Sequence, residues 1–155
     1  MIYDNLALAN ALIFDNAYHI LKQRMDIGTV SHSQLDMSLA VPVAVNCSFS
    51  CEMLLKSMLP IGTRGHGIND LFTQLTTSEQ SGIVDGTMQL LRLHKTDYTT
   101  ENFYSDLNHH DKAFIQWRYF HEKHDGNLNF NILFMEYFHE TLKALALFYN
   151  KNPEV

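Results

Sequence analysis

Residues 3–25 read YDNLALANALIFDNAYHILKQRM, and this stretch decides the fold class. Apolar side chains recur in it, and just before it, mostly at intervals of three or four residues, which is the period of one face of an α-helix. They are Ile2, Leu6, Ala9, Ile13, Ala17, Ile20 and Leu21. The spacing predicts a first helix over about 3–25 that ends near Gly28, followed by a polar turn over 26–33.

A second helical pattern follows the turn and runs to about Leu59, where Pro60 and Gly62 stop it. Pro42 falls inside this pattern. Because proline has no amide hydrogen for the bond to the residue four positions earlier, the helix either begins near residues 39–41 or is kinked at Pro42. We favour a start near Pro42.

A capping box marks the start of another helix, which reaches about Leu93. Thr76 with Glu79, or Thr77 with Gln80, has the spacing in which two side chains reciprocally satisfy the free amides of a helix N-terminus.

The remaining segments also show helical periodicity. The glycine-rich loop 60–67 leads to a short amphipathic helix over 69–75, and a helical turn is expected around 101–107. A helix over about 111–123 and a last helix over about 129–149 complete the chain.

No stretch of useful length alternates apolar and polar residues with the period of a half-buried strand. The predicted fold class is therefore all-α, as an antiparallel bundle of five or six helices. At 155 residues, with 46% of residues hydrophobic and 18% charged, the chain has the length and composition of one globular domain spanning 1–155.

The charge of the chain opposes general nucleic-acid binding. Its 11 Lys and Arg residues against 17 Asp and Glu residues give a formal net charge of -6, and the basic residues form no run. Sequence-independent capture of RNA or DNA relies on many phosphate contacts from clustered cations, so this class of function is not favoured.

The sequence also predicts a cytoplasmic location without a membrane span. The weakly polar stretch 39–49 is interrupted by Pro42, Asn46 and Ser48 and is too short to cross the roughly 30 Å of hydrocarbon in a bilayer. The first residues, MIYDN, carry an acid and no basic cluster, unlike a secretory or transit signal.

Neither cysteines nor histidines show the spacing of a structural metal site, so no metal and no cofactor is predicted. Cys47 and Cys51 stand four apart in a helical pattern and are interpreted as two small buried side chains, the alternative being a redox pair or half of a metal site. The histidines of the C-terminal half are His109, His110, His121, His124 and His139.

Three segments, taken in order, resemble the HEPN superfamily, the small helical domains found in prokaryotic toxins, phage-defence proteins and partners of nucleotidyltransferases. Residues 50–59 (SCEMLLKSML) resemble its E-x-x-L-K-x-x-L helix, and residues 65–75 (GHGINDLFTQL) its H-D-L-x-x-L-F-x-x-L segment with two residues inserted. Residues 113–122 (AFIQWRYFHE) are similar to a W-R-Y-x-x-E helix of some small members. The resemblance implies a HEPN-like bundle that forms a homodimer.

Active members of this family are metal-independent ribonucleases with an Arg and, after four to six residues, a His. Arg118 and His124 match this pattern with five residues between them, although Tyr119 stands where active members usually have a small or polar residue. A histidine can move the 2′-hydroxyl proton while an arginine stabilises the charge on the phosphate. Alternatively, Arg118 is a structural partner of Glu122 or of a carboxylate on a neighbouring helix, and His124 is a solvated helix end.

Ligand-binding residues are expected at the same place and on the second helix. Trp117, His121 and His124 lie on one stripe that can stack on a base or form core or dimer interface, and Tyr119 and Glu122 lie beside it. Glu52, four residues before Lys56, predicts a helical ion pair.

Two functions follow from the sequence and the resemblance. The favoured one is a non-catalytic HEPN-like module that binds a nucleotide, an RNA end or a protein partner, in a stress or phage-defence setting. The alternative is a toxin-like endoribonuclease that uses Arg118 and His124. The expected partners are a second copy of the chain and, from the resemblance, a nucleotidyltransferase or an antitoxin.

Overall fold

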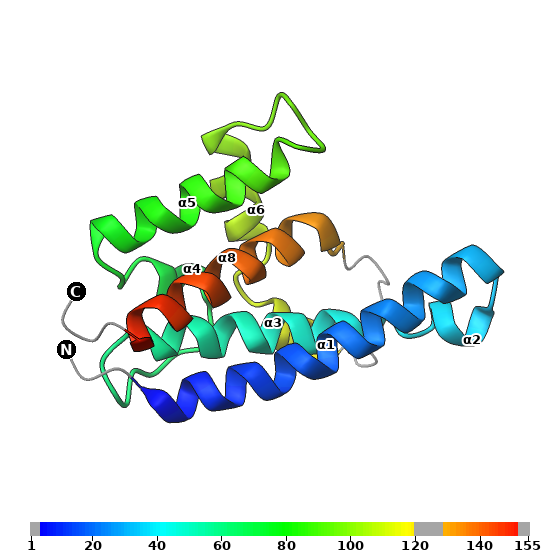
Figure 1. The fold of residues 1–155 in the computed structure, drawn as a ribbon, viewed down its shortest axis with the longest axis horizontal. Helices are drawn as coiled ribbons and strands as arrows, with labels where there is room; N and C mark the ends of the chain where they lie inside the picture. The colour runs from blue at the N-terminus through cyan, green and yellow to red at the C-terminus, as the bar shows by residue number, and fades with distance from the viewer. Residues whose placement is uncertain (1–3, 120–128, 152–155) are drawn as a thin grey trace.

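The computed structural model describes residues 4–119 and 129–151, and within these ranges the chain is helical and contains no strand (Figure 1). The predicted all-α fold class is therefore confirmed. The helices in chain order are α1 (Asn5–Ser31), α2 (Gln34–Met37), α3 (Ala40–Ser57), α4 (Ile68–Phe72), α5 (Thr77–Leu91), α6 (Thr100–His109), α7 (Ala113–Arg118) and α8 (Ile132–Lys151).

Four long helices form the body of the molecule. Helix α3 lies between α1 and α8, and α8 in turn lies between α3 and α5 (Figure 1). Helices α1 and α3 run antiparallel, as do α5 and α8, whereas α3 and α8 run in the same direction. The predicted antiparallel bundle of five or six helices is therefore right only in part, since the described residues form eight helices and one neighbouring pair is parallel. The core fills the space between the four long helices, and its largest fully buried side chains include Tyr18, Leu54, Phe103, Phe134 and Phe138.

Helix α1 is longer than its apolar pattern predicts. It begins after Asp4, whose carboxylate accepts a 3.0 Å hydrogen bond from the amide of Ala7, and it ends at His32, which adopts a left-handed conformation with φ 57°. The predicted end near Gly28 and the turn over 26–33 are wrong. Gly28 lies inside the helix because α2 folds back against it, and Asp36 occupies the space that a larger side chain would need.

Helix α3 begins at Ala40, so Pro42 lies in its first turn, where a missing amide hydrogen costs nothing. The start favoured from the sequence is confirmed. The helix is central, and Cys47, Cys51, Leu54 and Leu55 on it are fully buried. Both cysteines are free thiols, as interpreted from their spacing.

Within the described part of the chain, one helical stretch, Gln34–Ser57, is long and apolar enough to cross a membrane by length and composition alone. It comprises α2 and α3, and half of its most apolar part is buried inside the protein. The core helix of a soluble protein has the same properties, so the predicted cytoplasmic location and absence of a membrane span stay predictions.

The later helices follow their capping signals. Thr76 and Glu79 form the predicted capping box of α5, and Thr99 and Asn102 form a second one at the start of α6. Helix α7 ends at Arg118, well before the predicted end at residue 123. The loop 60–67 connects α3 to α4, as expected.

Candidate functional site

The residues predicted to carry catalysis or ligand binding at 117–124 lie only partly within the described ranges. Trp117 is half-buried at the end of α7, with its ring edge-to-face against Phe130 at a centroid distance of 5.5 Å. Tyr119 follows as the residue that ends the helix, and its side chain is exposed. His121, Glu122 and His124 lie outside the described residues, so their predicted roles stay predictions.

Arg118 is exposed and contacts aromatic rings. Its guanidinium carbon lies 5.8 Å from the ring centre of Phe114 and 5.4 Å from that of Tyr119, both within the range of cation–π attraction. No carboxylate of residues 4–119 or 129–151 forms an ion pair with it. Within that part of the chain, Arg118 is therefore not the structural partner of an acid on a neighbouring helix.

Glu52 and Lys56 form the ion pair that their spacing predicts, with 2.8 Å between Lys56 Nζ and Glu52 Oε1. The same oxygen lies 2.8 Å from Nδ1 of His66 in the loop 60–67. Glu52 is completely buried, and its second oxygen has no partner among the described residues. The contacts fix the loop to α3; ligand binding by this pair stays a prediction.

The apolar pattern of α1 lies mainly on its exposed face. Four aliphatic side chains point outward, with exposed fractions of 73% for Leu6, 63% for Ile13, 61% for Ile20 and 50% for Ile27. We refer to these four residues as the α1 stripe. A helix on the surface of a globular protein normally turns its apolar residues inward, so the stripe is an uncovered apolar face.

The opposite face of α1 explains why these apolar side chains point outward. It buries Ala7, Leu8, Ala11 and Tyr18, and two of these four residues are alanines. Small side chains allow the backbones of α1 and α3 to approach closely, and Ser50 of α3 donates a 3.0 Å hydrogen bond directly to the carbonyl oxygen of Ala11. Leu8 is buried, and Leu12 and Leu21 also pack against the core, but the four residues of the stripe are left on the outside.

The α1 stripe has the repeat of a coiled-coil seam. Its members are separated by seven residues each, and a seven-residue apolar repeat keeps one narrow line of side chains facing a partner helix. The stripe runs from Leu6 to Ile27, 21 residue steps that rise roughly 31 Å at about 1.5 Å per residue. The residues beside it are mostly uncharged, with Arg24 and Asp26 as the exceptions: Asn5, Ala9, Asn10, Asn16, Ala17, Gln23, Arg24 and Asp26.

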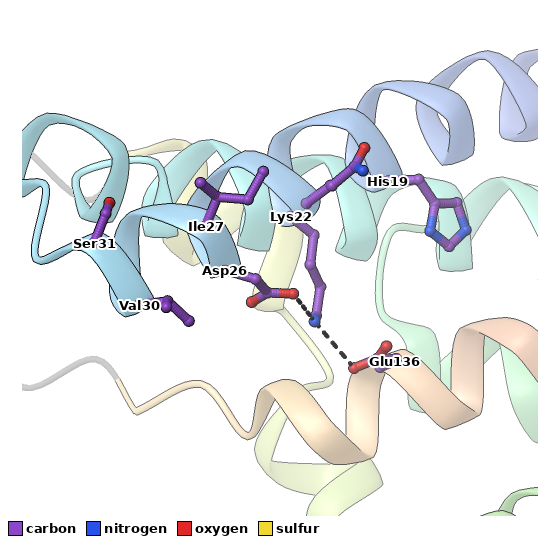
Figure 2. A pocket seen from close by; sticks show the side chains of 8 residues that line it. His19, Lys22, Asp26, Ile27, Val30, Ser31 and Glu136 are labelled. Carbon is purple, nitrogen blue, oxygen red and sulfur yellow. Dashed lines mark hydrogen bonds and ion pairs between the residues drawn. The ribbon is translucent and has the colours of Figure 1, made fainter.

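A groove of about 620 Å³ lies beside the C-terminal half of the stripe, between α1 and the start of α8 (Figure 2). Ile27 and Val30 form an apolar part of the groove wall. Lys22 lies across the groove, with its Nζ 2.8 Å from Asp26 Oδ2 and 3.6 Å from Glu136 Oε2. Burial lowers the pKa of Lys22, but its hydrogen bond to Asp26 and the nearby Glu136 outweigh burial, and its pKa is raised. Lys22 therefore stays charged.

A partly buried group of ionisable side chains lies nearer the middle of α1, where this helix meets α8. We refer to Asp15, His19, His139, Glu140 and Lys143 as the polar cluster. His19 Nε2 lies 3.0 Å from Asp15 Oδ1 and 3.1 Å from Glu140 Oε1. Lys143 Nζ lies 3.2 Å from Asp15 Oδ1 and 3.0 Å from Glu140 Oε2.

His139 lies at the bottom of the polar cluster and is completely buried. Its Nε2 is 2.9 Å from Ser50 Oγ, and its Nδ1 is 3.6 Å from Glu140 Oε1. The neighbouring imidazole of His139 and the ammonium of Lys143 lower the pKa of Glu140 to about 2, against the opposing effect of burial. Glu140 is thus an anion at neutral pH.

Asp15, His19, His139 and Glu140 can each offer one oxygen or nitrogen atom, and these atoms lie within 4.8 Å of one another. This arrangement was missed in the sequence because its two halves are more than a hundred residues apart. The available signal was the four-residue spacing of Asp15 and His19 on one helix together with the adjacent pair His139 and Glu140.

These features define an all-α protein with an uncovered apolar helix face and a separate, partly buried polar cluster. Comparison with protein-family models, with characterised proteins and with solved structures yields no match. The resemblance to the HEPN superfamily therefore stays a prediction from three short segments.

Proposed function

We propose that the protein is a non-catalytic, HEPN-like binding module that works by associating with protein, and that a second copy of the chain covers the α1 stripe. The observation that carries this proposal is the stripe itself, four exposed aliphatic side chains at seven-residue intervals on one helix. The resemblance adds a stress or phage-defence setting, with a nucleotidyltransferase or an antitoxin as a further partner.

A second copy suits the stripe because the stripe is self-complementary. A two-fold axis passing between Asn16 and Ala17 would bring Leu6 opposite Ile27 and Ile13 opposite Ile20 of the other copy, with α1 antiparallel to itself. Symmetric interfaces of this kind use the same surface on both subunits. Every aliphatic side chain of the stripe then has an aliphatic neighbour.

The charges near the stripe also permit self-association. Two copies of a chain with net charge -6 repel each other unless the contact surface lacks acids. The stripe itself contains none, and beside it only Arg24 and Asp26 are charged, the acid being paired with Lys22. An apolar, nearly uncharged surface also supports a protein as the ligand rather than a nucleotide or an RNA end, which need cations.

The energy available suits a reversible dimer. Removing the remaining exposed surface of each stripe side chain from water contributes roughly 1 to 2 kcal/mol, and a dimer covers eight of them. The gross gain, roughly 8 to 16 kcal/mol, exceeds the cost of bringing two proteins together when that cost lies near the low end of its range of about 4 to 15 kcal/mol. A micromolar dissociation constant needs a net gain of about 8 kcal/mol, and this low-cost case is the one that we propose.

Sedimentation velocity from about 1 to 100 µM tests the proposal. The wild type should change from monomer to dimer over this range, and Ile13→Lys with Ile20→Lys should remain monomeric and folded. The matched control is Leu93→Lys, since Leu93 is 74% exposed outside the stripe. A wild type that is monomeric throughout, or a double variant that still dimerises, would contradict the proposal.

A second candidate function is the metal-independent ribonuclease that uses Arg118 and His124. The observation that favours it is the exposed guanidinium of Arg118, which contacts two aromatic rings and no acid among the described residues. Such a cation is available to a phosphate. An assay for RNA cleavage in EDTA separates this function from the first.

A further inference from the structure

His139 presents an unsatisfied lone pair to a carboxylate. Ser50 has one hydroxyl hydrogen and donates it to the carbonyl oxygen of Ala11 at 3.0 Å. Ser50 Oγ therefore accepts the 2.9 Å hydrogen bond with His139, and the proton must be on His139 Nε2. In the neutral ring, Nδ1 then carries a lone pair; it is buried, has no hydrogen-bond partner among the described residues, and lies 3.6 Å from Glu140 Oε1.

A nitrogen lone pair and a carboxylate oxygen at this distance repel each other unless a proton or a metal ion lies between them. Four donor atoms within 4.8 Å of one another favour the metal ion. We infer that Asp15, His19, His139 and Glu140 bind a divalent transition-metal ion, with Zn²⁺ as the best-suited one. The site is separate from the α1 stripe and does not depend on the dimer.

The spacing of the donor atoms fits a tetrahedral ion. Metal–ligand distances of about 2.0 to 2.2 Å place neighbouring ligands of a tetrahedron roughly 3.3 to 3.6 Å apart. The observed separations are 3.0 Å from Asp15 to His19, 3.1 Å from His19 to Glu140 and 3.6 Å from Glu140 to His139. All four donor atoms lie within 4.8 Å of one another, so side-chain shifts of about 1 Å or less bring them to tetrahedral spacing.

The surroundings of His139 are those of a metal ligand. A histidine that binds a metal through one nitrogen usually donates its other N–H to a fixed acceptor, which sets the tautomer and the ring orientation. Ser50 provides that acceptor, and the ring of Tyr18 packs edge-on against the imidazole with a centroid distance of 5.5 Å. His139 is thus held in position before any ion arrives.

Lys143 supplies the positive charge of the cluster in the ion-free protein. Its ammonium contacts Asp15 and Glu140 and lies 3.4 Å from His19 Nε2, so it neutralises the same donors that the ion would use. Because its side chain is long and partly exposed, it can rotate toward solvent when the ion binds. Lys143 therefore competes with the metal.

The donor set decides the class of ion. Two imidazoles and two carboxylates suit Zn²⁺ and Co²⁺, whereas Mg²⁺ and Ca²⁺ prefer a shell of oxygens. A metal ion can reach the site from solvent past His19, because this side chain is about half exposed and also lines the groove beside α1 (Figure 2).

Titration with Co²⁺ and with Zn²⁺ tests the site. Metal-free protein should develop the visible absorption of tetrahedral Co²⁺ and lose it when Zn²⁺ is added. His19→Ala, at an exposed position that leaves the fold intact, should weaken Zn²⁺ binding in calorimetry by at least about ten-fold. Lys143→Gln should tighten it by about ten-fold, because the competing ammonium is gone.

His32→Asn is the matched control, since His32 is an exposed histidine with a left-handed conformation that asparagine accepts. It should bind both ions like the wild type. No Co²⁺ absorption in either the wild type or Lys143→Gln would overturn the inference, as would binding that His19→Ala leaves unchanged. Because these readouts do not depend on oligomeric state, they also distinguish failure of the metal site from failure of the proposed dimer.

Discussion

Gly28 of α1 lies directly against Asp36 of α2. A Cβ atom at residue 28 would overlap the Cβ of Asp36 and lie 3.1 Å from its carbonyl carbon. Arg24, one turn earlier, donates a 2.8 Å hydrogen bond to the carboxylate of the same Asp36. The turn between α1 and α2 therefore depends on a contact that only glycine permits and on one ion pair.

Gly28→Ala should destabilise the protein by roughly 1 to 3 kcal/mol, because the added methyl group has no room. Helix propensity alone predicts a gain of about 1 kcal/mol for the same change, so the sign of the effect is informative. Gly82→Ala is the control, since a Cβ there would make ordinary contact with Leu145 at 3.7 Å and should stabilise α5. Urea unfolding of both variants measures the difference, and a Gly28→Ala variant as stable as the wild type would contradict the close packing.

His110 should make stability depend on pH below neutrality. Its Nδ1 donates to the carbonyl oxygen of Asp106 at 2.8 Å, and its Nε2 accepts from the amide of Asn131 at 3.0 Å, an arrangement that requires the neutral ring. Burial lowers the pKa of His110, with neighbouring His109 acting in the same direction and Asp106 opposing it.

The unfolded chain therefore binds the proton of His110 more readily than the folded chain. The contribution is present above the unfolded pKa of about 6.5 and is lost as the pH falls toward the lower folded pKa, with a slope of up to about 1.4 kcal/mol per pH unit. Urea unfolding from pH 8 to pH 5 measures it. His110→Gln should show a smaller slope than the wild type, and His32→Asn an unchanged one; equal slopes in the wild type and His110→Gln would rule out this role.

Glu52→Ala should cost about 3 kcal/mol of stability, because it removes a buried carboxylate that accepts hydrogen bonds from Lys56 and His66. The fixed position of the loop 60–67 should be lost with it. Asp85→Ala on the exposed face of α5 provides the control and should change stability by less than about 0.5 kcal/mol. Thermal melting compares the three proteins, and a loss in Glu52→Ala no larger than the control would show that the ion pair is dispensable.

Arg118→Ala should lower stability by less than about 1 kcal/mol, the value of an exposed cation–π contact. If the protein is a non-catalytic module, wild type and variant should both leave a single-stranded RNA intact in EDTA. Metal-free cleavage by the wild type, lost in both Arg118→Ala and His124→Ala at unchanged melting temperature, would establish the ribonuclease instead.

Local signals in the sequence predicted most of the helices correctly. Pro42 marked the start of α3, and Thr76 with Glu79 marked the start of α5, because both act through backbone groups within one helical turn. Gly28, by contrast, was wrongly interpreted as the end of the first helix, because glycine is also a local signal. Its role is set by Asp36 on another helix, and no pattern within a single helix reports such a contact.

The functional surfaces were harder to predict. The apolar period of α1 identified a helix, but periodicity does not say which face is buried, and the small residues Ala7 and Ala11 reversed the usual orientation. The polar cluster joins α1 to α8, so Asp15 and His139 meet only after folding. The ion pair of Glu52 and Lys56 was predictable because both residues lie on one helix, one turn apart.

The end of α1 together with α2 extends beyond the rest of the molecule (Figure 1). Few side chains there are buried, so this segment can open locally while the helices around α3 stay folded, and its amide hydrogens should exchange with solvent first. The groove beside α1 includes Asp26, Val30 and Ser31 from this segment. Anything that fills the groove must therefore slow exchange there, so hydrogen exchange at residues 24–37 reports on occupancy of the groove before the ligand is known.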